Sequence, residues 1–364
     1  MKKILIINPF GIGDVIFSTP LIDTIKKRYP DTSIGYVCNM RTYDVIKADP
    51  NLDRVFIFEK DEYRRLWQSS RMACLKKIIS SLKEIKKERY DISIDLSLGY
   101  IYSMFLSLIG VRERLGFNYK NRGIFLTKKI DIDGFSDKHV IEYYLEFLKL
   151  LDIEKEGLKP APLVHVGKFE SVWADDFLKC NGVSRGSLIV GIIPGCGASW
   201  GKDANYRRWD RENFAGVADS LIDRYNARIV LFGDPKEIEI CEGVQALMRN
   251  RAILSCGKTD VGKFLALLKK CGLVITNDGG PLHIAVGLGI KTVSIFGPVD
   301  DRIYGPYPPD KKRHIVISAG NMPCRPCYVK FKYKVCKEMS CLKKIKTGDV
   351  FEAAERLLGF EEMA

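Results

Sequence analysis

Short apolar runs alternate along this chain with longer stretches in which apolar residues recur at helical spacing. The runs that we interpret as buried strands are residues 3–7, 33–37, 55–58, 91–96, 188–194, 228–232, 252–254, 272–276 and 292–296. Nearly continuous apolar strands that alternate with helices are typical of parallel sheets covered by helices on both faces. The pattern therefore predicts an α/β protein.

The length of 364 residues is too great for one ordinary core and suits two domains, since a domain takes roughly 150 residues. We predict a first domain at 1–165, a linker region at 166–187, a second domain at 188–346 and a C-terminal helix at 347–364. No apolar run approaches the roughly 20 residues that span a bilayer, and the first run is too short for a signal peptide. We therefore expect a cytoplasmic protein.

One segment, residues 274–298, has the pattern of a strand, a polar turn, a helix and a second strand. The turn contains Asp278, Gly279 and Gly280, and we expect the helix to start at about Pro281. The free N–H groups of such a helix start, next to two glycines, predict a seat for a phosphate. Asp278 would repel phosphate, so it would cap the helix or orient a neighbouring donor. His283 is either a structural hydrogen-bonder or a charged donor.

A second glycine-rich turn follows the first strand. It contains Gly11, Gly13 and Asp14, and it opens a helix. A dinucleotide fingerprint would place a third glycine where this chain has Ile16, which weakens an NAD-binding interpretation. Asp14 either complements the positive end of the helix dipole or acts as a carboxylate base at the strand edge.

A third glycine-rich loop follows the predicted strand 188–194 and leads to Lys202, Arg207 and Arg208. Glycines followed by cations form a second candidate phosphate cradle, although the loop lacks the Walker pattern. Glu237 follows the strand 228–232. It could accept hydrogen bonds from ribose hydroxyls, or it could be an ordinary glutamate at a helix start.

Basic residues outnumber acidic ones by 58 to 45, a formal net charge of +13, which favours polyanionic partners. A predicted helix at 62–88 carries many of them, together with Trp67. It is either a solvated outer helix or a face that meets anionic lipid headgroups. A second basic group, which could receive an anionic acceptor, consists of Arg112, Arg114, Lys120, Arg122, Lys128 and Lys129.

Most of the eleven cysteines lie in apolar segments, as small buried residues of a reducing compartment do. The exception is a C-terminal group with the spacing C-x2-C-x8-C-x4-C. It consists of Cys324, Cys327, Cys336 and Cys341. These four could form a structural, non-catalytic zinc site, or they could stay unligated thiols.

Several stretches together resemble glycosyltransferase family 9, the ADP-heptose:lipopolysaccharide heptosyltransferases, over almost the whole chain. The matching stretches are residues 11–20, 194–199, 207–209, 213–214, 232–237 and 276–283. The resemblance implies a GT-B fold, in which two Rossmann-like parallel-sheet domains face across a cleft. It also implies an inverting, metal-independent glycosyltransferase that moves a heptose or related sugar from ADP-heptose or a similar nucleotide sugar to a lipopolysaccharide core or related glycolipid.

The resemblance further implies residue roles. Asp14 would be the general base, and Glu237 would bind the adenosine ribose. The full donor-binding set that we predict is Ser199, Arg207, Glu237, Asp278, Gly279, Gly280 and His283. The acceptor-binding set is Gly11, Gly13, Arg112, Arg114, Lys120 and Arg122. Arg207 stands where the family usually has lysine, and Gly279 where it commonly has Ser or Thr, so donor preference stays open.

We expect no cofactor besides the donor, no nucleic acid partner, a monomer, and peripheral contact with the cytoplasmic face of the inner membrane. Two alternatives stay open. One is a nucleotide-sugar epimerase of the same architecture. The other is a non-catalytic protein that binds anionic glycolipid or nucleic acid through its positive charge.

Overall fold

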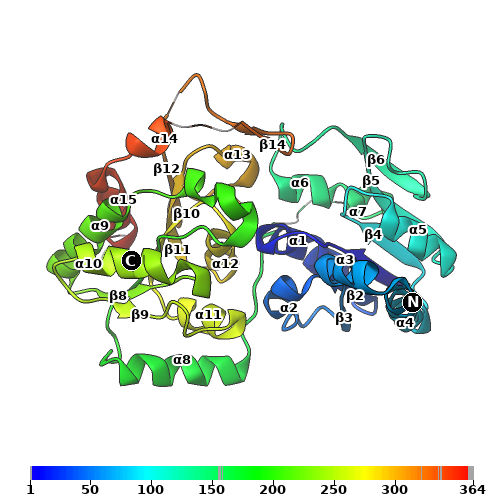
Figure 1. The fold of residues 1–364 in the computed structure, drawn as a ribbon, viewed down its shortest axis with the longest axis horizontal. Coiled ribbons are helices and arrows are strands. Elements are labelled where there is room, and N and C mark those ends of the chain that lie inside the picture. Colours follow the sequence, from blue (N-terminus) through cyan, green and yellow to red (C-terminus); the bar gives the residue numbers. More distant parts are fainter. Residues whose placement is uncertain are drawn as a thin grey trace. The chain divides into compact units, whose positions relative to one another are not determined.

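The computed structural model describes residues 2–154, 157, 159–320, 322–334, 336 and 338–359, and only the backbone of residues 198–200 and 202. Within this part, the chain divides into two units, Met1–Pro160 and Ala161–Ala364. Each unit has its own six-stranded sheet with helices around it (Figure 1). The expected α/β class is confirmed.

The sheet of the first unit has the order β3-β2-β1-β4-β5-β6, and every neighbouring pair is parallel. Its strands are β1 (Lys3–Ile7), β2 (Ser33–Cys38), β3 (Arg54–Ile57), β4 (Ile92–Asp95), β5 (Glu113–Tyr119) and β6 (Lys128–Ile132). Its helices are α1 (Ile12–Arg28), α2 (Met40–Ile46), α3 (Lys60–Ser69), α4 (Arg71–Glu88), α5 (Ile101–Leu108), α6 (Val140–Leu145) and α7 (Phe147–Leu150).

The sheet of the second unit has the order β12-β11-β10-β7-β8-β9, again parallel throughout. Its strands are β7 (Ile189–Ile193), β8 (Arg228–Leu231), β9 (Ile253–Leu254), β10 (Leu273–Asn277), β11 (Lys291–Phe296) and β12 (His314–Ser318), and a small antiparallel pair, β13 (Tyr328–Val329) and β14 (Lys332–Tyr333), stands apart. Its α-helices are α8 (Lys168–Cys180), α9 (Arg211–Tyr225), α10 (Ile238–Leu247), α11 (Val261–Leu268), α12 (Gly280–Gly287), α13 (Asp301–Tyr304), α14 (Ser340–Lys343) and α15 (Thr347–Gly359).

The two sheets share one topology. Read from β9 to β12, the second sheet repeats the 3-2-1-4-5-6 order of the first, which is the order of dinucleotide-binding folds. In such sheets the strand order reverses between strands 1 and 4, and ligands bind outside the carboxyl ends of those strands. The switch points here are β1/β4 and β7/β10, and all three predicted glycine-rich turns follow one of these strands.

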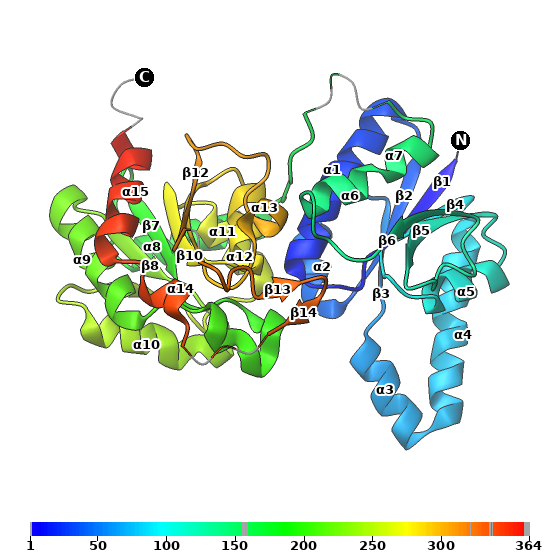
Figure 2. The ribbon, with the colours of Figure 1, turned by 90° about the horizontal axis from the view of Figure 1, so that it is seen from above.

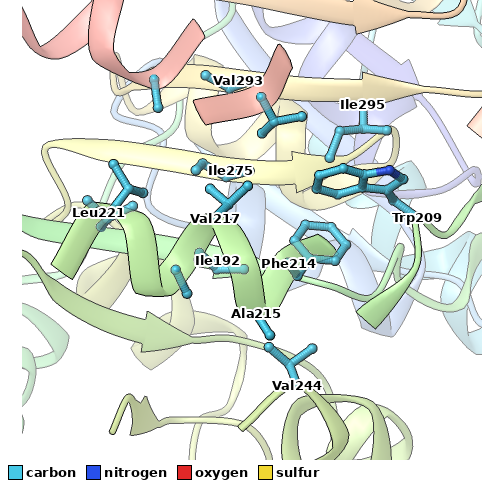
Figure 3. Packing of buried hydrophobic residues seen from close by; sticks show 14 of the residues in the cluster. Ile192, Trp209, Phe214, Ala215, Val217, Leu221, Val244, Ile275, Val293 and Ile295 are labelled. Carbon is cyan, nitrogen blue, oxygen red and sulfur yellow. The ribbon is translucent and has the colours of Figure 1, made fainter. Parts of the chain in front are cut away.

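The core of the second unit fixes the segment that leads into its site. Phe214, Val217 and Leu221 recur at helical spacing on α9 and pack against the central strands (Figure 3). Trp209, just before this helix, is buried in the same cluster, and its indole Nε1 donates to the carbonyl of Ile345 at 3.0 Å. The chain immediately before Trp209 is therefore anchored to the core.

Several element boundaries differ from the predicted ones. Residues 166–187, predicted as a linker, contain α8, which packs against α11 within the second unit. The helix predicted at 62–88 is interrupted at Ser70, where the backbone is extended and the side chain caps α4 by accepting from Ala73 N at 3.2 Å. Strands β5, β6 and β12 were not predicted. Helix α15 lies within the predicted helix 347–364, of which residues 360–364 fall outside the described part.

Candidate functional site

The turn between β10 and α12 lies at the β7/β10 switch point. Strand β10 ends at Asn277, and α12 starts at Gly280 with Pro281 in its first turn, close to the predicted start. The N-cap residue is Gly279, which has no side chain, so among the described residues no side chain caps the N–H groups of the first turn. A helix start of this kind favours a bound anion.

A buried carboxamide joins three segments at this point. The Asn277 Nδ2 donates to the carbonyls of Pro194 and Gly195 at 2.9 and 3.0 Å, and its Oδ1 accepts from Trp209 N at 3.0 Å. The two partners of Nδ2 only accept and the partner of Oδ1 only donates, so the orientation of the amide is determined. Asn277 thus holds the loop after β7 and the segment before α9 against the end of β10.

Gly279 lies where the turn meets the loop after β7. Its φ is +154°, and a Cβ added there would lie 2.6 Å from the carbonyl oxygen of Cys196. A heavy atom at that distance from backbone must displace the loop. The Ser or Thr that the family resemblance would place at this position therefore does not fit the turn of this chain.

Asp278 forms a buried ion pair with Arg207. The Arg207 Nη2 lies 2.5 Å from the Asp278 Oδ2, and both side chains are almost fully buried. Burial raises the pKa of the Asp278 carboxyl, and the Arg207 charge opposes that rise. Of the two roles predicted for Asp278, the structure shows the orienting one, because Asp278 makes no helix cap and instead positions a cation.

The Glu237 carboxylate holds the loop after β7 from the other side. Its Oε1 accepts from the N–H groups of Cys196 and Gly197, each at 3.1 Å, and its Oε2 accepts from Asp234 N at 3.2 Å. Arg208 approaches the same carboxylate at 3.4 Å. Glu237 is therefore a brace of the loop, and contact with a ribose stays a prediction. Ser199, whose side chain is not described, cannot be placed in this site.

The turn after β1 in the first unit has a similar construction. Asn8 is fully buried, and its Nδ2 donates to the carbonyl of Asp14 at 2.9 Å. Asn39 donates to the carbonyls of Pro9 and Phe10 at 3.1 and 2.6 Å. The Asp14 Oδ2 accepts from Gly11 N at 3.2 Å, as an acid in the first turn of a helix does. Burial raises the pKa of Asp14 to about 6, against the effect of this hydrogen bond.

Comparison with known proteins decides the family. Residues 78–336, more than half of the chain, match the profile of glycosyltransferase family 9 (heptosyltransferase). The chain belongs to glycosyltransferase family 9.

Relatives and solved structures agree with this assignment. The lipooligosaccharide heptosyltransferase 2 of Campylobacter jejuni is 26% identical over 362 residues, which are 98% of each chain. The family 9 glycosyl transferase from Veillonella parvula is 25% identical, with a TM-score of 0.80 over 98% of this chain and 97% of that one. The Escherichia coli ADP-heptose lps heptosyltransferase II has a TM-score of 0.77 and 22% identity over 100% of both chains. The predicted GT-B type of fold is confirmed.

The residues predicted to bind the acceptor have different environments in this glycosyltransferase. Arg114 donates to the carbonyls of Val111, Arg112 and Phe125, so its guanidinium supports its own loop. Lys120 and Arg122 are exposed and lie over the ring of Tyr119, with distances to the centroid of 5.0 and 6.0 Å. Arg112 is exposed, and Gly13 lies in the first turn of α1. Acceptor binding by these residues stays a prediction.

The four C-terminal cysteines range from exposed Cys324 to buried Cys341. Burial raises the pKa of the Cys327 thiol, and the other three thiols are close enough to raise it further. Among the residues that the structure describes, no group of three or more His, Cys, Asp or Glu is placed to hold a metal ion. Of the two alternatives that the spacing left open, a structural zinc site therefore gains no support from the described residues.

In the part of the chain that the structure describes, no helix is long and apolar enough to cross a membrane.

Sequence reasoning overlooked the asparagines that hold the turns. Asn8 and Asn39 directly follow β1 and β2, and Asn277 is the last residue of β10, so all three lie at the edge where ligands of this fold bind. An asparagine in that position is the signal that could have identified them, because its amide can donate to one loop and accept from another.

Adding a hydroxyl at Gly279 should damage the turn. We expect Gly279→Ser to lower the free energy of unfolding by about 1–3 kcal/mol, because the new Cβ overlaps the Cys196 carbonyl. Urea unfolding measures this. Gly348→Ser, at a helical glycine where a Cβ meets open space, is the matched control and should change stability little. Equal stability of the two variants would contradict the steric argument.

Removing the charge of Asp278 should be costly. Asp278→Asn removes the carboxylate that pairs with the buried Arg207 guanidinium, for which we expect a loss of about 3–5 kcal/mol in the free energy of unfolding. Asp175→Asn breaks the surface pair with Lys270 and should cost less than about 1 kcal/mol. Chemical denaturation compares the two variants. Similar losses in the free energy of unfolding would show that the buried pair stabilises the fold no more than the surface pair does.

Proposed function

We propose that this protein transfers a heptose, or a related sugar, from ADP-heptose or a similar nucleotide sugar to a lipopolysaccharide core or related glycolipid, with inversion at the anomeric carbon. One observation carries the proposal. In a family 9 glycosyltransferase, the β7/β10 switch point combines an uncapped helix start with a cation, Arg207, that a buried carboxylate holds in place. The names of the Campylobacter and E. coli proteins support the choice of sugar and acceptor class.

The donor pyrophosphate would bind at the start of α12. The N–H groups beside Gly279 and Gly280 and the Arg207 guanidinium supply positive charge where the departing diphosphate becomes more negative. Because these groups do that work, we propose that no metal is required. Glu237 keeps the loop after β7 in position. In this proposal its carboxylate oxygens also accept hydrogen bonds from the ribose hydroxyls of the donor. His283, which is buried on α12, is the remaining residue that we propose to bind the donor.

Asp14 would be the base of the reaction. Its carboxylate takes the proton of the acceptor hydroxyl as that oxygen forms a bond to the anomeric carbon, and the bond from that carbon to the diphosphate breaks. A single attack of this kind inverts the anomeric carbon. A pKa of about 6 keeps Asp14 mostly ionised at neutral pH while leaving it a stronger base than an ordinary carboxylate.

For the acceptor, we propose that exposed Arg112, Lys120 and Arg122 meet anionic groups of the glycolipid. The enzyme would act at the cytoplasmic face of the inner membrane as a peripheral protein and a monomer. The family assignment favours transfer over the epimerase alternative, which would need no acceptor.

A transfer assay tests the reaction. Wild-type protein is incubated with ADP-heptose and lipopolysaccharide that lacks heptose, with and without EDTA. We expect product of one added heptose, with inverted configuration by NMR, at similar rates in both arms. If no product forms although a nucleotide sugar binds tightly, the natural donor or acceptor differs from the one tested. Loss of product in EDTA would contradict metal independence.

The same assay tests the base. We expect Asp14→Asn to lower kcat by about 10²–10⁴-fold, the usual contribution of a general base. Asp31→Asn, an exposed acid in the same unit, is the matched control and should retain activity. In the wild type, kcat/KM should fall as the pH drops through about 6, because Asp14 is then protonated and can no longer accept a proton. If the fall of kcat/KM at low pH persists in Asp14→Asn, a group other than Asp14 causes that fall.

A further inference from the structure

Helices α3 and α4 form a hairpin that extends from the sheet of the first unit (Figure 2). The two helices contact each other through their inner faces. The hydroxyls of Tyr63 and Ser81 lie 2.9 Å apart, and the Cys74 thiol donates to the carbonyl of Tyr63 at 3.5 Å. The chain turns at Ser70, and Figure 2 shows this turn at the far end of the hairpin. The hairpin is thus a stable element with an exposed tip.

Apolar side chains lie on the surface of this hairpin that the fold does not cover. At roughly 100° per residue, Cys74, Ile78, Ser81 and Ile85 fall on the inner face of α4. Met72, Leu75 and Ile79 fall on the outer face, and all three are exposed. At the tip, Trp67 is 54% exposed and Met72 is 65% exposed. Several large apolar side chains exposed together on one element indicate a surface that binds a partner or a membrane.

The same surface is strongly basic. Residues 60–89 hold ten Lys and Arg against four Asp and Glu, a net charge of +6 out of +13 for the whole chain. Helical spacing places Lys76, Lys83 and Lys86 on the outer face of α4, among the exposed apolar residues. The Arg71 guanidinium lies over the Trp67 ring, 5.5 Å from its centroid. The outer face therefore combines cations with apolar side chains.

We propose that the α3–α4 hairpin docks this protein on an anionic phospholipid bilayer. Trp67 and Met72 would enter the headgroup region, where amphipathic aromatic side chains concentrate, and the lysines of the outer face would pair with lipid phosphates. The charge disfavours a dimer in which this hairpin meets the same hairpin of a second copy, because two surfaces of net charge +6 would repel each other. A purely electrostatic partner would leave the exposed apolar residues unexplained.

The place of the hairpin in the fold agrees with this role. Helix α3 begins directly after β3, at the carboxyl edge of the sheet, which is also the edge that carries the turn of Asp14. Docking through the hairpin would hold that edge on the side of the molecule from which a membrane-embedded acceptor arrives. This deepens the proposed function and rests on it for the choice of acceptor, whereas vesicle binding can be measured without it.

Vesicle sedimentation tests the proposal with full-length protein. We expect binding to vesicles of phosphatidylglycerol and phosphatidylethanolamine, weak binding to phosphatidylcholine, and a fall in binding as salt rises. Lys76→Glu with Lys83→Glu should weaken binding by more than about tenfold, since each basic residue near an anionic surface contributes roughly a fivefold factor. Trp67→Ser with Met72→Ser should weaken it on the order of tenfold and leave the salt dependence in place.

Matched controls come from the second unit. Helix α8 exposes Phe169 and Val172, at 80% and 62%, and carries two basic against three acidic residues. Phe169→Ser with Val172→Ser should leave vesicle binding unchanged, as should the exposed pair Lys311→Glu with Lys312→Glu. A loss in the controls equal to that in the hairpin variants would overturn the assignment to the hairpin.

A second readout separates this proposal from the proposed function. Hairpin variants should transfer sugar normally to a deacylated, water-soluble acceptor and slowly to the same acceptor embedded in anionic vesicles. Unchanged vesicle binding in the hairpin variants would overturn the docking proposal even if transfer proceeds. Hairpin-dependent binding of RNA, or a hairpin-dependent dimer, in protein that does not bind vesicles would overturn it as well. A wild type that binds vesicles through the hairpin but transfers nothing would contradict only the proposed function.

Discussion

The carboxamide of Asn277 is the interaction on which the candidate donor site depends. It is fully buried, and it connects the end of β10, the loop after β7 and the segment before α9 through three hydrogen bonds. A buried amide that lost one of these partners would leave polar groups unsatisfied, so the three segments are held in one arrangement. The first unit uses Asn8 and Asn39 in the same way around the turn of Asp14.

This arrangement explains why an acidic residue lies at a predicted phosphate seat. Asp278 is buried behind Arg207 and directs the guanidinium, so its charge serves to place a cation. Glu237 acts in parallel on the loop after β7, where its carboxylate accepts from two consecutive backbone N–H groups. The positive character of the site therefore depends on two buried carboxylates that keep its donors in position.

Both units place their functional turns at equivalent points of one topology. The turn after β1 carries Asp14, and the turns after β7 and β10 carry the groups suited to a diphosphate. Parallel sheets concentrate such groups because strand ends, helix starts and their uncapped N–H groups meet at one edge. The topology that the two units share thus supplies the two edges on which the proposed reaction places its base and its donor site.

The sequence alone determined nine of the twelve strands of the two sheets, the helix start near Pro281 and the family, because apolar runs, glycine turns and Pro at a helix start are local signals. It left open the role of Asp278, which depends on a partner 71 residues away, and it did not identify Asn277 as a link between loops. Tertiary structure also decided that residues 62–88 form a hairpin, because the cap at Ser70 ends the helical pattern that the apolar spacing continues. These features rest on contacts between distant segments, and periodicity carries no information about them.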